Sequence, residues 1–363
     1  MSRFARDRRV YFVEEPGHDA AVPFLEVVIC QRTQVRVVVP HLNPQADRNR
    51  TLESLLAGFL RTEFIHKPIV WFYTPMAMEF FPESVRPGAT VYDCMDELSL
   101  FRGAPLELRN LEERLLGKAD LIFTGGVSLF EAKRHSHKSV YPFPSGVDVQ
   151  HFVQARSASG EFDEQVDMPR PRLGYAGVID ERIDLPLLDE VAARRPDWQF
   201  VMIGPTAKID AATLPRHANI HWLGIKDYAD LPRYFAGWDV GIMPFALNDA
   251  TRFISPTKTP EYLAAGLPVV STAIRDVVRP YGELGLARIA NSADEFIDAS
   301  ERAMSADMCM KWRERSDEFL KGLSWDSVWA GMNRLICEAL PVEKALAPET
   351  VAVAELEPEI SHV

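Results

Sequence analysis

Short apolar runs alternate with amphipathic stretches along most of the chain, in two separate series. The first series extends to Thr124, and its apolar runs are VYFV, EVVIC, VRVVV, IVWFY, ATVYD and DLIFT. Stretches with helical spacing, such as RTLESLLAGFLRTEF and LELRNLEERLLGKA, lie between several of them. This alternation predicts an α/β domain with a mainly parallel sheet. EVVICQRTQVRVVVP is the exception and predicts a hairpin, because its two strands are too close for a helical crossover.

A polar segment, residues 154–171, follows the first series, and its serine, glycine, proline and acidic residues predict a linker. The second series then begins, with the apolar runs RLGYAG, QFVMIG, NIHWLG, DVGIMP and LPVVST. We therefore predict an α/β fold with an N-terminal domain over residues 1–153 and a second domain over residues 172–324. Two such domains would place a ligand between the carboxyl ends of their strands. Residues 341–363 are acidic and rich in proline and alanine, and they predict a disordered tail.

Composition narrows the class of protein. The 363 residues suffice for two domains, and the formal net charge of −12 argues against nucleic acid as the main partner. The chain contains no run of about 18 apolar residues, so no membrane span is predicted. Cys30, Cys94, Cys309 and Cys337 are scattered without metal-ligand spacing, which is typical of reduced cytosolic cysteines. We expect a cytoplasmic protein.

The stretch ISPTKTPEYLAAGLPVVST, residues 254–272, combines a helix start, a lysine and a glutamate. Either Ser255 or Thr259 can cap the helix, because each precedes a proline, and the residues leave this choice open. In both cases free N–H groups near Lys258 create a site for an anion. Glu261 would repel a phosphate beside it, but it could bind a pair of hydroxyls about a ribose length away. The plain alternative is a capped helix with a solvated lysine and glutamate.

In their order along the chain, these segments resemble the retaining nucleotide-sugar glycosyltransferases of family 4, which have the GT-B fold. The resemblance rests on five segments: YPFPSGVDVQHF, LGYAGVIDERIDLPLL, NIHWLGIKDYADLPRYFAGWDVGIMPF, the stretch 254–272, and LSWDSVWAGMNRLI. It implies two Rossmann-like domains that face each other across a cleft, and a helix over residues 325–340 that crosses back to the N-terminal domain. It also implies that the first strand of the N-terminal domain is missing from this sequence, because SRFA matches the tail of a helix and RVYFV the strand after it.

The family's donor motif contains two glutamates separated by seven residues. Glu261 matches the second glutamate, which binds the ribose hydroxyls, whereas Phe253 stands at the position of the first, which usually contacts the donor sugar. The resemblance therefore implies that the sugar contact comes from elsewhere, with Asn248, Asp249 and Arg252 as candidates. The phosphate-binding amides fall on Pro256, which has no N–H, and on Thr257 and Lys258. We expect donor binding by Ser255, Thr257, Lys258 and Glu261.

Two further segments supply donor contacts by the same resemblance. Arg182 lies within one residue of the family's diphosphate-binding lysine, although a solvated loop charge is the alternative. Backbone groups of Leu223, Gly224 and Ile225 would meet the nucleobase. Lys226 could reach the phosphates or be an ordinary surface lysine.

Polar residues after strands of the N-terminal domain are candidates for the acceptor side. In the family that the chain resembles, the loop at VYDCMDELS faces the cleft and often carries a His-Asp pair near the reacting sugar. Met95 stands at the histidine position, so the resemblance makes Asp96 our choice for the catalytic group, to orient the acceptor or accept its proton. We expect Asp93 to be a local helix cap or turn residue. The plain alternative is that both aspartates are helix caps. His41 in VPHLNP, and Tyr73 and Thr74, could line the acceptor side by position alone.

No metal-binding pattern accompanies these residues, so we expect no metal or other cofactor, and Arg182, Lys258 and the helix end would neutralise the leaving diphosphate. The resemblance implies a retaining transferase that moves a sugar from a nucleotide-diphosphate donor to a glycan or lipid-linked acceptor. Its expected role is surface polysaccharide or glycoconjugate synthesis, at the inner face of the membrane if it associates peripherally. The alternatives are a GT-B sugar-nucleotide epimerase and an inactive nucleotide-binding partner lobe.

Overall fold

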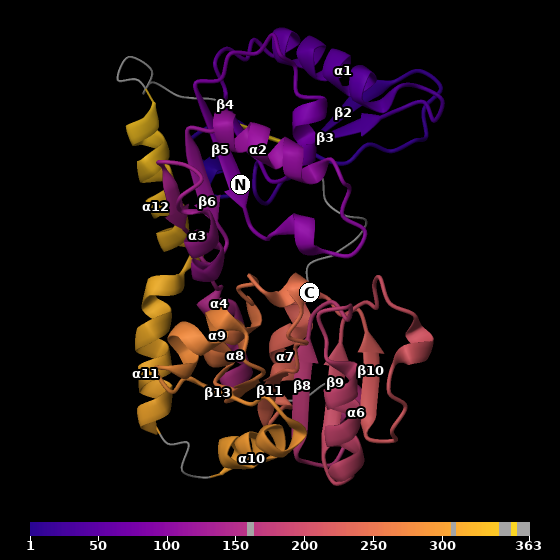
Figure 1. Ribbon diagram of the computed structural model, residues 1–363, viewed down its shortest axis with the longest axis vertical. Coiled ribbons are helices and arrows are strands. Elements are labelled where there is room, and N and C mark those ends of the chain that lie inside the picture. Colours follow the sequence, from indigo (N-terminus) through magenta and orange to yellow (C-terminus); the bar gives the residue numbers. More distant parts are fainter. Residues whose placement is uncertain (158–162, 306–309, 341–349, 354–363) are drawn as a thin grey trace. The chain divides into compact units, whose positions relative to one another are not determined.

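The computed structural model describes residues 1–157, 163–305, 310–340 and 350–353, the last four by their backbone only. The chain forms two compact units. Unit 1 contains Met1–Ser99, Gly103–Phe143 and the described residues of Trp329–Glu359. Unit 2 contains Leu100–Arg102 and the described residues of Pro144–Val328. Each unit has its own sheet (Figure 1).

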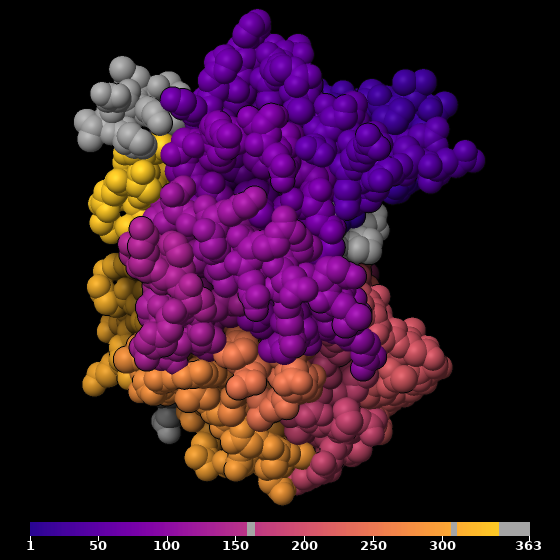
Figure 2. Space-filling view, turned by 45° about the horizontal axis from the view of Figure 1, so that its top comes forward, coloured from indigo at the N-terminus to yellow at the C-terminus, as the bar shows by residue number. Residues whose placement is uncertain are grey.

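Unit 1 is built on an eight-stranded sheet with the order β2-β3-β1-β14-β4-β5-β6-β7. Its strands are β1 (Val10–Val13), β2 (Phe24–Ile29), β3 (Arg36–His41), β4 (Ile69–Phe72), β5 (Ala89–Cys94), β6 (Leu121–Thr124), β7 (Val140–Pro142) and β14 (Thr350–Val353). Every neighbouring pair is parallel except β2 and β3. The antiparallel β2–β3 pair confirms the predicted hairpin. Figure 2 shows the indigo N-terminal part of the chain, which includes this hairpin, projecting from the side of unit 1.

Strand β14 changes the prediction for the tail. It lies between β1 and β4 and is parallel to both, with Val10 opposite Thr350 and Ile69 opposite Thr350 from the other side. The prediction of disorder over residues 341–363 is therefore wrong for Thr350–Val353, where β-branched residues favour an extended backbone. The rest of the predicted tail lies outside the described residues.

The α-helices of unit 1 pack around this sheet. Those that lie wholly within unit 1, among the described residues, are α1 (Arg48–Thr62), α2 (Leu108–Lys118) and α3 (Val127–Lys133). Helix α1 begins after Asp47, whose side chain accepts a hydrogen bond from the Arg50 N–H, and it buries Leu52, Leu56 and Leu60. This spacing is the apolar stripe expected of a helix that covers a sheet.

Unit 2 has a six-stranded, fully parallel sheet with the order β10-β9-β8-β11-β12-β13. Its strands are β8 (Arg172–Ala176), β9 (Gln199–Ile203), β10 (Ile220–Gly224), β11 (Val240–Met243), β12 (Val269–Ser271) and β13 (Ala287–Ile289). Its helices are α4 (Val149–Phe152), α5 (Asp163–Val166), α6 (Leu185–Arg194), α7 (Leu231–Ala236), α8 (Lys258–Ala265), α9 (Arg275–Val277), α10 (Ala293–Met304) and α11 (Met310–Leu320). Strands β8, β9 and β11 are buried along their whole length and mostly apolar, as is typical of the centre of a parallel sheet covered on both faces.

The predicted linker belongs to unit 2 in its described part. Gln165 is fully buried, accepts a hydrogen bond from the Trp238 indole N–H (2.8 Å) and donates one to the Tyr234 carbonyl (3.2 Å). The polar composition indicated an exposed segment, but this one amide fixes α5 to the core. The predicted domain boundary after residue 153 is also wrong, because unit 2 begins at Pro144.

Helix α12 (Trp325–Ala339) carries the chain from unit 2 back into unit 1. Its residues from Trp329 onward belong to unit 1, where Leu335 and Ile336 are buried in a core with Phe4 and Trp71. A helix that returns to the first unit agrees with the expectation for residues 325–340.

Candidate functional site

Three glycines bring the carboxyl ends of neighbouring strands in unit 2 into backbone contact. Gly177 follows β8, Gly204 follows β9 and Gly224 ends β10, and all three have positive φ angles. The Gly204 N–H donates to the Gly224 carbonyl (2.9 Å), and an added Cβ on Gly204 would lie 2.0 Å from the Gly177 oxygen. Gly177 and Gly204 therefore leave no room for side chains of their own at this edge, which is where open α/β sheets bind ligands.

Helix α8 begins at Lys258 beside this edge, and neither predicted cap is correct. The N-cap residue is Thr257, which makes no side-chain cap bond, and Ser255 lies in the preceding loop. Thr259 is buried within the first turn, where its hydroxyl donates to the Met243 sulfur. Because Pro260 has no N–H, the first turn offers the Lys258 and Thr259 amides to an anion.

The Lys258 amine lies over Gly177 at the end of β8. Its Nζ is 5.6 Å from the centre of the Tyr175 ring, and a Cβ added to Gly177 would lie 2.1 Å from its Cε. Burial lowers the pKa of Lys258, an effect that the nearby Glu261 carboxylate opposes and the Arg182 charge reinforces. A desolvated cation at a helix N-terminus is well suited to bind an anionic group.

Arg182 is held by a residue that the sequence did not single out. Its guanidinium donates to both carboxylate oxygens of the buried Asp180, with Nε–Oδ1 at 2.9 Å and Nη2–Oδ2 at 2.7 Å. Both charges act on the pKa of Lys258, so Asp180, Arg182 and Lys258 belong to one cluster. The i, i+2 spacing of the aspartate and arginine was the only available signal in the sequence.

Glu261 lies one helical turn after Lys258. Burial raises the pKa of Glu261 to about 7, although the Lys258 charge and a hydrogen bond from Thr257 oppose the rise. Its charge also contributes, after burial, to raising the pKa of Tyr228. Tyr228 stacks on His151, with ring centroids 4.4 Å apart. The half-buried Glu261 carboxylate thus has an aromatic neighbour, Tyr228, which the sequence did not indicate.

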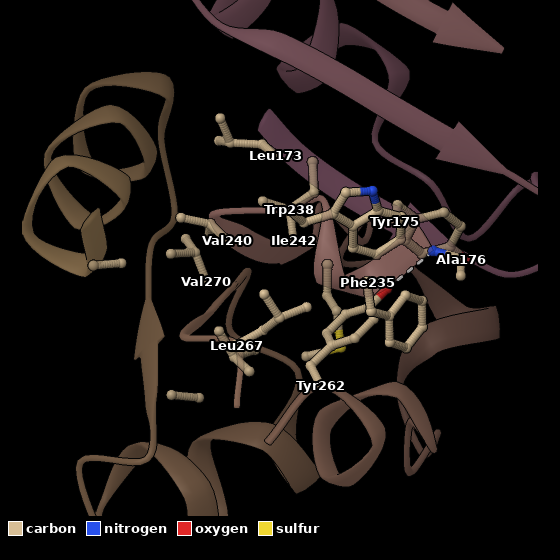
Figure 3. Packing of buried hydrophobic residues seen from close by; sticks show 14 of the residues in the cluster. Leu173, Tyr175, Ala176, Phe235, Trp238, Val240, Ile242, Tyr262, Leu267 and Val270 are labelled. Atoms are coloured by element: carbon tan, nitrogen blue, oxygen red, sulfur yellow. Dashed lines mark hydrogen bonds between the residues drawn. The ribbon is translucent and has the colours of Figure 1, made fainter. Parts of the chain in front are cut away.

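The middle and the end of α8 are fixed to the rest of unit 2. In its middle the Tyr262 hydroxyl accepts a hydrogen bond from the Ala176 N–H (2.9 Å), which ties the helix to the end of β8 (Figure 3). At its end Gly266 has φ +80°, as expected of a helix stop, and Arg156 donates to the Ala264 and Leu263 carbonyls. Arg156 also pairs with Asp317 on α11. These contacts hold Lys258 and Glu261 in a fixed position.

The remaining predicted donor residues of unit 2 are less closely connected to this cluster. Ile225 is 58% exposed next to Gly224, which is accessible for backbone contacts. Asn248 accepts from the Thr251 N–H and donates to the Glu181 carbonyl, so its side chain serves local structure. Arg252 is exposed over the Phe253 ring. Lys226 pairs with Glu164 at 2.7 Å.

The candidates of unit 1 follow the ends of their strands. Asp96 is half-buried in the bend after β5, and the Cys94 thiol donates to its carbonyl. Asp93 is neither a cap nor a turn, because it lies on β5 with its side chain buried against the Trp71 indole N–H (3.2 Å). His41 ends β3, stacks on Phe24 and bonds to Asp19 (2.9 Å), which raises its pKa.

Replacing Gly177 with alanine is expected to weaken nucleotide-diphosphate binding at least tenfold, because the new methyl group would displace Lys258 and the backbone φ of +152° is strained for alanine. Isothermal titration calorimetry would measure the loss. Gly117→Ala is the matched control, since nothing lies within 4 Å of its added Cβ. Equal affinity in folded Gly177→Ala protein would show that Lys258 does not need this position.

Replacing Asp93 with asparagine is expected to stabilise unit 1 at pH 8 and to have little effect at pH 4. Burial raises the pKa of Asp93 from 3.8 to about 7, so the folded state retains a proton that the unfolded state loses between these values. Stability therefore falls as the pH rises through this window, by at most roughly 4 kcal/mol. Hydrogen exchange of β5 across the pH range would measure the effect, with exposed Glu113→Gln as the control. A pH slope that persists in Asp93→Asn would contradict this assignment.

Among the described residues, no group of three or more His, Cys, Asp or Glu side chains is arranged to hold a metal ion. Within the same part of the chain, no helix has both the length and the apolar character required to cross a bilayer.

Residues 170–306 match the family model described as glycosyl transferases group 1. This segment contains Asp180, Arg182, Lys258 and Glu261. The chain is also similar to TuaH of Bacillus subtilis (strain 168), which is named as a teichuronic acid biosynthesis glycosyltransferase. The two are 29% identical over 202 residues. That match covers 50% of each chain, so the protein spans about half the length of this curated relative.

Solved structures show the same fold over nearly the whole chain. Sucrose-phosphate synthase from Thermosynechococcus elongatus has a TM-score of 0.67 at 13% identity, covering 91% of this chain and 99% of that one. The trehalose-phosphate synthase (UDP-forming) of Burkholderia xenovorans has a TM-score of 0.65 at 14% identity, covering 92% and 100%. At these identities the likeness shows the fold alone. It confirms the predicted α/β class with two Rossmann-like units of GT-B type.

Proposed function

We propose that the protein is a metal-independent, retaining glycosyltransferase of family 4 that uses a nucleotide-diphosphate sugar. The observation that carries this proposal is the position of half-buried Lys258 at the start of α8 and over Gly177, with half-buried Glu261 one turn later. Both lie in the segment that matches the glycosyltransferase family model. A cation and a carboxylate at this spacing suit the diphosphate and the ribose of one nucleotide.

In this proposal the donor lies along the carboxyl edge of the sheet in unit 2. Its diphosphate meets Lys258, Arg182 and the free amides of the first turn of α8. Glu261 accepts hydrogen bonds from the ribose hydroxyls, and the exposed backbone at Gly224 meets the base. Asp180 fixes the guanidinium of Arg182 in advance, which reduces the reorganisation needed when the donor binds.

The transfer breaks the bond between the anomeric carbon and the diphosphate oxygen, and an acceptor hydroxyl forms the new bond to that carbon. Negative charge grows on the departing diphosphate, where Lys258, Arg182 and the helix end stabilise it. Asp96 in unit 1 is the proposed group that orients the acceptor or takes its proton. Retention is proposed by analogy of fold, since a trehalose-6-phosphate synthase neighbour was studied for glycosyl transfer with retention.

The proposed acceptor is a glycan or a lipid-linked glycan, in surface polysaccharide or glycoconjugate synthesis. Similarity to a relative named for teichuronic acid biosynthesis supports this choice. Such an acceptor would place the protein at the inner face of the membrane as a peripheral protein.

A thermal-shift screen with UDP-, ADP-, GDP- and dTDP-sugars tests the proposal. A donor at 100 times its dissociation constant should add about 2.7 kcal/mol of stability. Glu261→Ala is the control, and a tenfold to hundredfold loss of affinity should reduce this added stability to about 0.4–1.4 kcal/mol. The absence of a shift with every donor would contradict the proposed function, and conversion of the donor to its epimer without an acceptor would indicate an epimerase instead.

The metal-free part has its own test once a donor and acceptor are found. The transfer rate should be unchanged in EDTA. A rate that EDTA abolishes and Mn²⁺ restores would overturn this part and leave the donor assignment intact.

A further inference from the structure

A groove in unit 1 lies apart from every residue assigned above. It has a volume of about 490 Å³ and lies among β4, β5, α2 and the segment that joins the two strands. Its apolar lining includes Phe72, Met78, Phe81 and Val85. Phe81 packs edge-on against Phe72, with ring centroids 5.5 Å apart, and Met78, Phe81 and Val85 are each only half-buried. The groove thus keeps apolar surface accessible.

The groove is mainly positively charged, whereas the protein as a whole is negatively charged. The chain has a net charge of −12, yet its lining contains the cations Arg86, Arg114 and Lys118 and a single acid, Glu83. Arg114 and Lys118 are four residues apart on α2 and therefore lie on the same side of the helix. Among the described residues, none of these three cations forms an ion pair.

The end of a helix favours cations, and this effect alone accounts for Lys118 near the last turn of α2. It does not account for Arg86, which lies outside the helix, or for the apolar residues between the cations. A soluble anion would need no apolar surface, and an uncharged lipid would need no cations. The combination is complementary to a molecule that has an anionic head and an apolar chain.

We propose that this groove binds an anionic membrane lipid, with its phosphate at Arg86, Arg114 and Lys118 and the start of its hydrocarbon chain on Met78 and Phe81. The lipid is a component of the bilayer surface, so the groove is a point of peripheral attachment. The inference is independent of the donor chemistry of unit 2, because lipid binding requires no nucleotide sugar. It would nevertheless bring the protein to the surface where a lipid-linked acceptor resides.

Cosedimentation of the full chain with vesicles tests this inference. The protein should bind phosphatidylcholine vesicles that contain phosphatidylglycerol, bind pure phosphatidylcholine much less, and dissociate as salt is added. The double variant Arg114→Gln/Lys118→Gln should bind roughly 25-fold more weakly, since each cation near an anionic surface contributes about fivefold. Met78→Gln should weaken binding as well, through the apolar surface.

The matched control is Arg50→Gln/Arg109→Gln, which removes two exposed cations of unit 1 outside the groove, one of them on α2. Equal loss in this control and in the groove variant would overturn the proposal, as would failure of the wild-type protein to bind anionic vesicles. Displacement by millimolar inorganic phosphate would indicate a site for free phosphate and would also overturn it. Unchanged melting temperatures establish that the variants fold, and unchanged donor binding separates this result from the function of unit 2.

Discussion

Lys258→Ala is expected to lower turnover about a hundredfold to a thousandfold while changing nucleoside monophosphate affinity only slightly. The amine is desolvated at the start of α8, where negative charge would develop on the departing diphosphate. Removal of one preorganised charge stabiliser typically costs this much in rate. A group that acts mainly in the transition state affects kcat more than ground-state binding. Steady-state kinetics and calorimetry would measure the two effects separately.

Lys226→Ala is the matched control for Lys258. Lys226 is also a lysine of unit 2, but it pairs with Glu164 and lies over the Tyr234 ring. Its removal should leave turnover within a few-fold of the wild-type value. If the two variants lose the same activity, or if Lys258→Ala reduces only affinity, Lys258 does not stabilise the leaving group. Arg182→Ala should follow the pattern of Lys258, since its guanidinium belongs to the same cluster.

The second large effect is expected for Glu261→Ala, which should weaken nucleotide binding tenfold to a hundredfold. Hydrogen bonds to a charged group contribute roughly 1.5–3 kcal/mol, and the ribose hydroxyls would lose them. A 2′-deoxyribonucleotide should bind the wild-type protein more weakly than its ribose counterpart, and the variant should no longer distinguish the two. Calorimetry with both nucleotides would measure the affinities.

The pH dependence gives an independent check on Glu261. Its pKa of about 7 means that the carboxylate becomes the main form as the pH rises from 6 to 8. The ionised form is the better acceptor for two hydroxyls, so affinity for a nucleotide sugar should increase over this interval. The increase should vanish in Glu261→Ala. Affinity that does not depend on pH in the wild-type protein, together with an unaffected variant, would remove Glu261 from the site.

Local patterns predicted those features whose cause is local. The close spacing of EVVIC and VRVVV predicted the hairpin, because no helix fits between the strands. Gly266 ends α8 because its φ of +80° suits glycine. The helix start was predicted less well, since two Ser/Thr-Pro pairs compete and the burial of Thr259, which excludes one of them, depends on the core around it.

Features that depend on distant residues were not predictable from such patterns. Gln165 lies in a segment that is polar in composition, and only the positions of Trp238 and Tyr234 make it a buried connection. Asp180 acquires its role in the charged cluster from Lys258, which lies far along the chain. The pairing of Val10 with Thr350 joins residues near opposite ends of the sequence, and no local propensity specifies such a partner.

The division of the chain into these two units affects the order in which they can fold during synthesis. Apart from Leu100–Arg102, the described residues of unit 2 come from one stretch, Pro144–Val328, whereas unit 1 also needs α12 and β14. On the ribosome, unit 2 can therefore complete its fold while the central position of the other sheet still has no strand. Closing a loop of this length is slow, and open strand edges are prone to aggregation in the meantime. The part of unit 1 that emerges first, up to Phe143, must therefore wait longest for its remaining elements, and it is the part that most needs protection by chaperones.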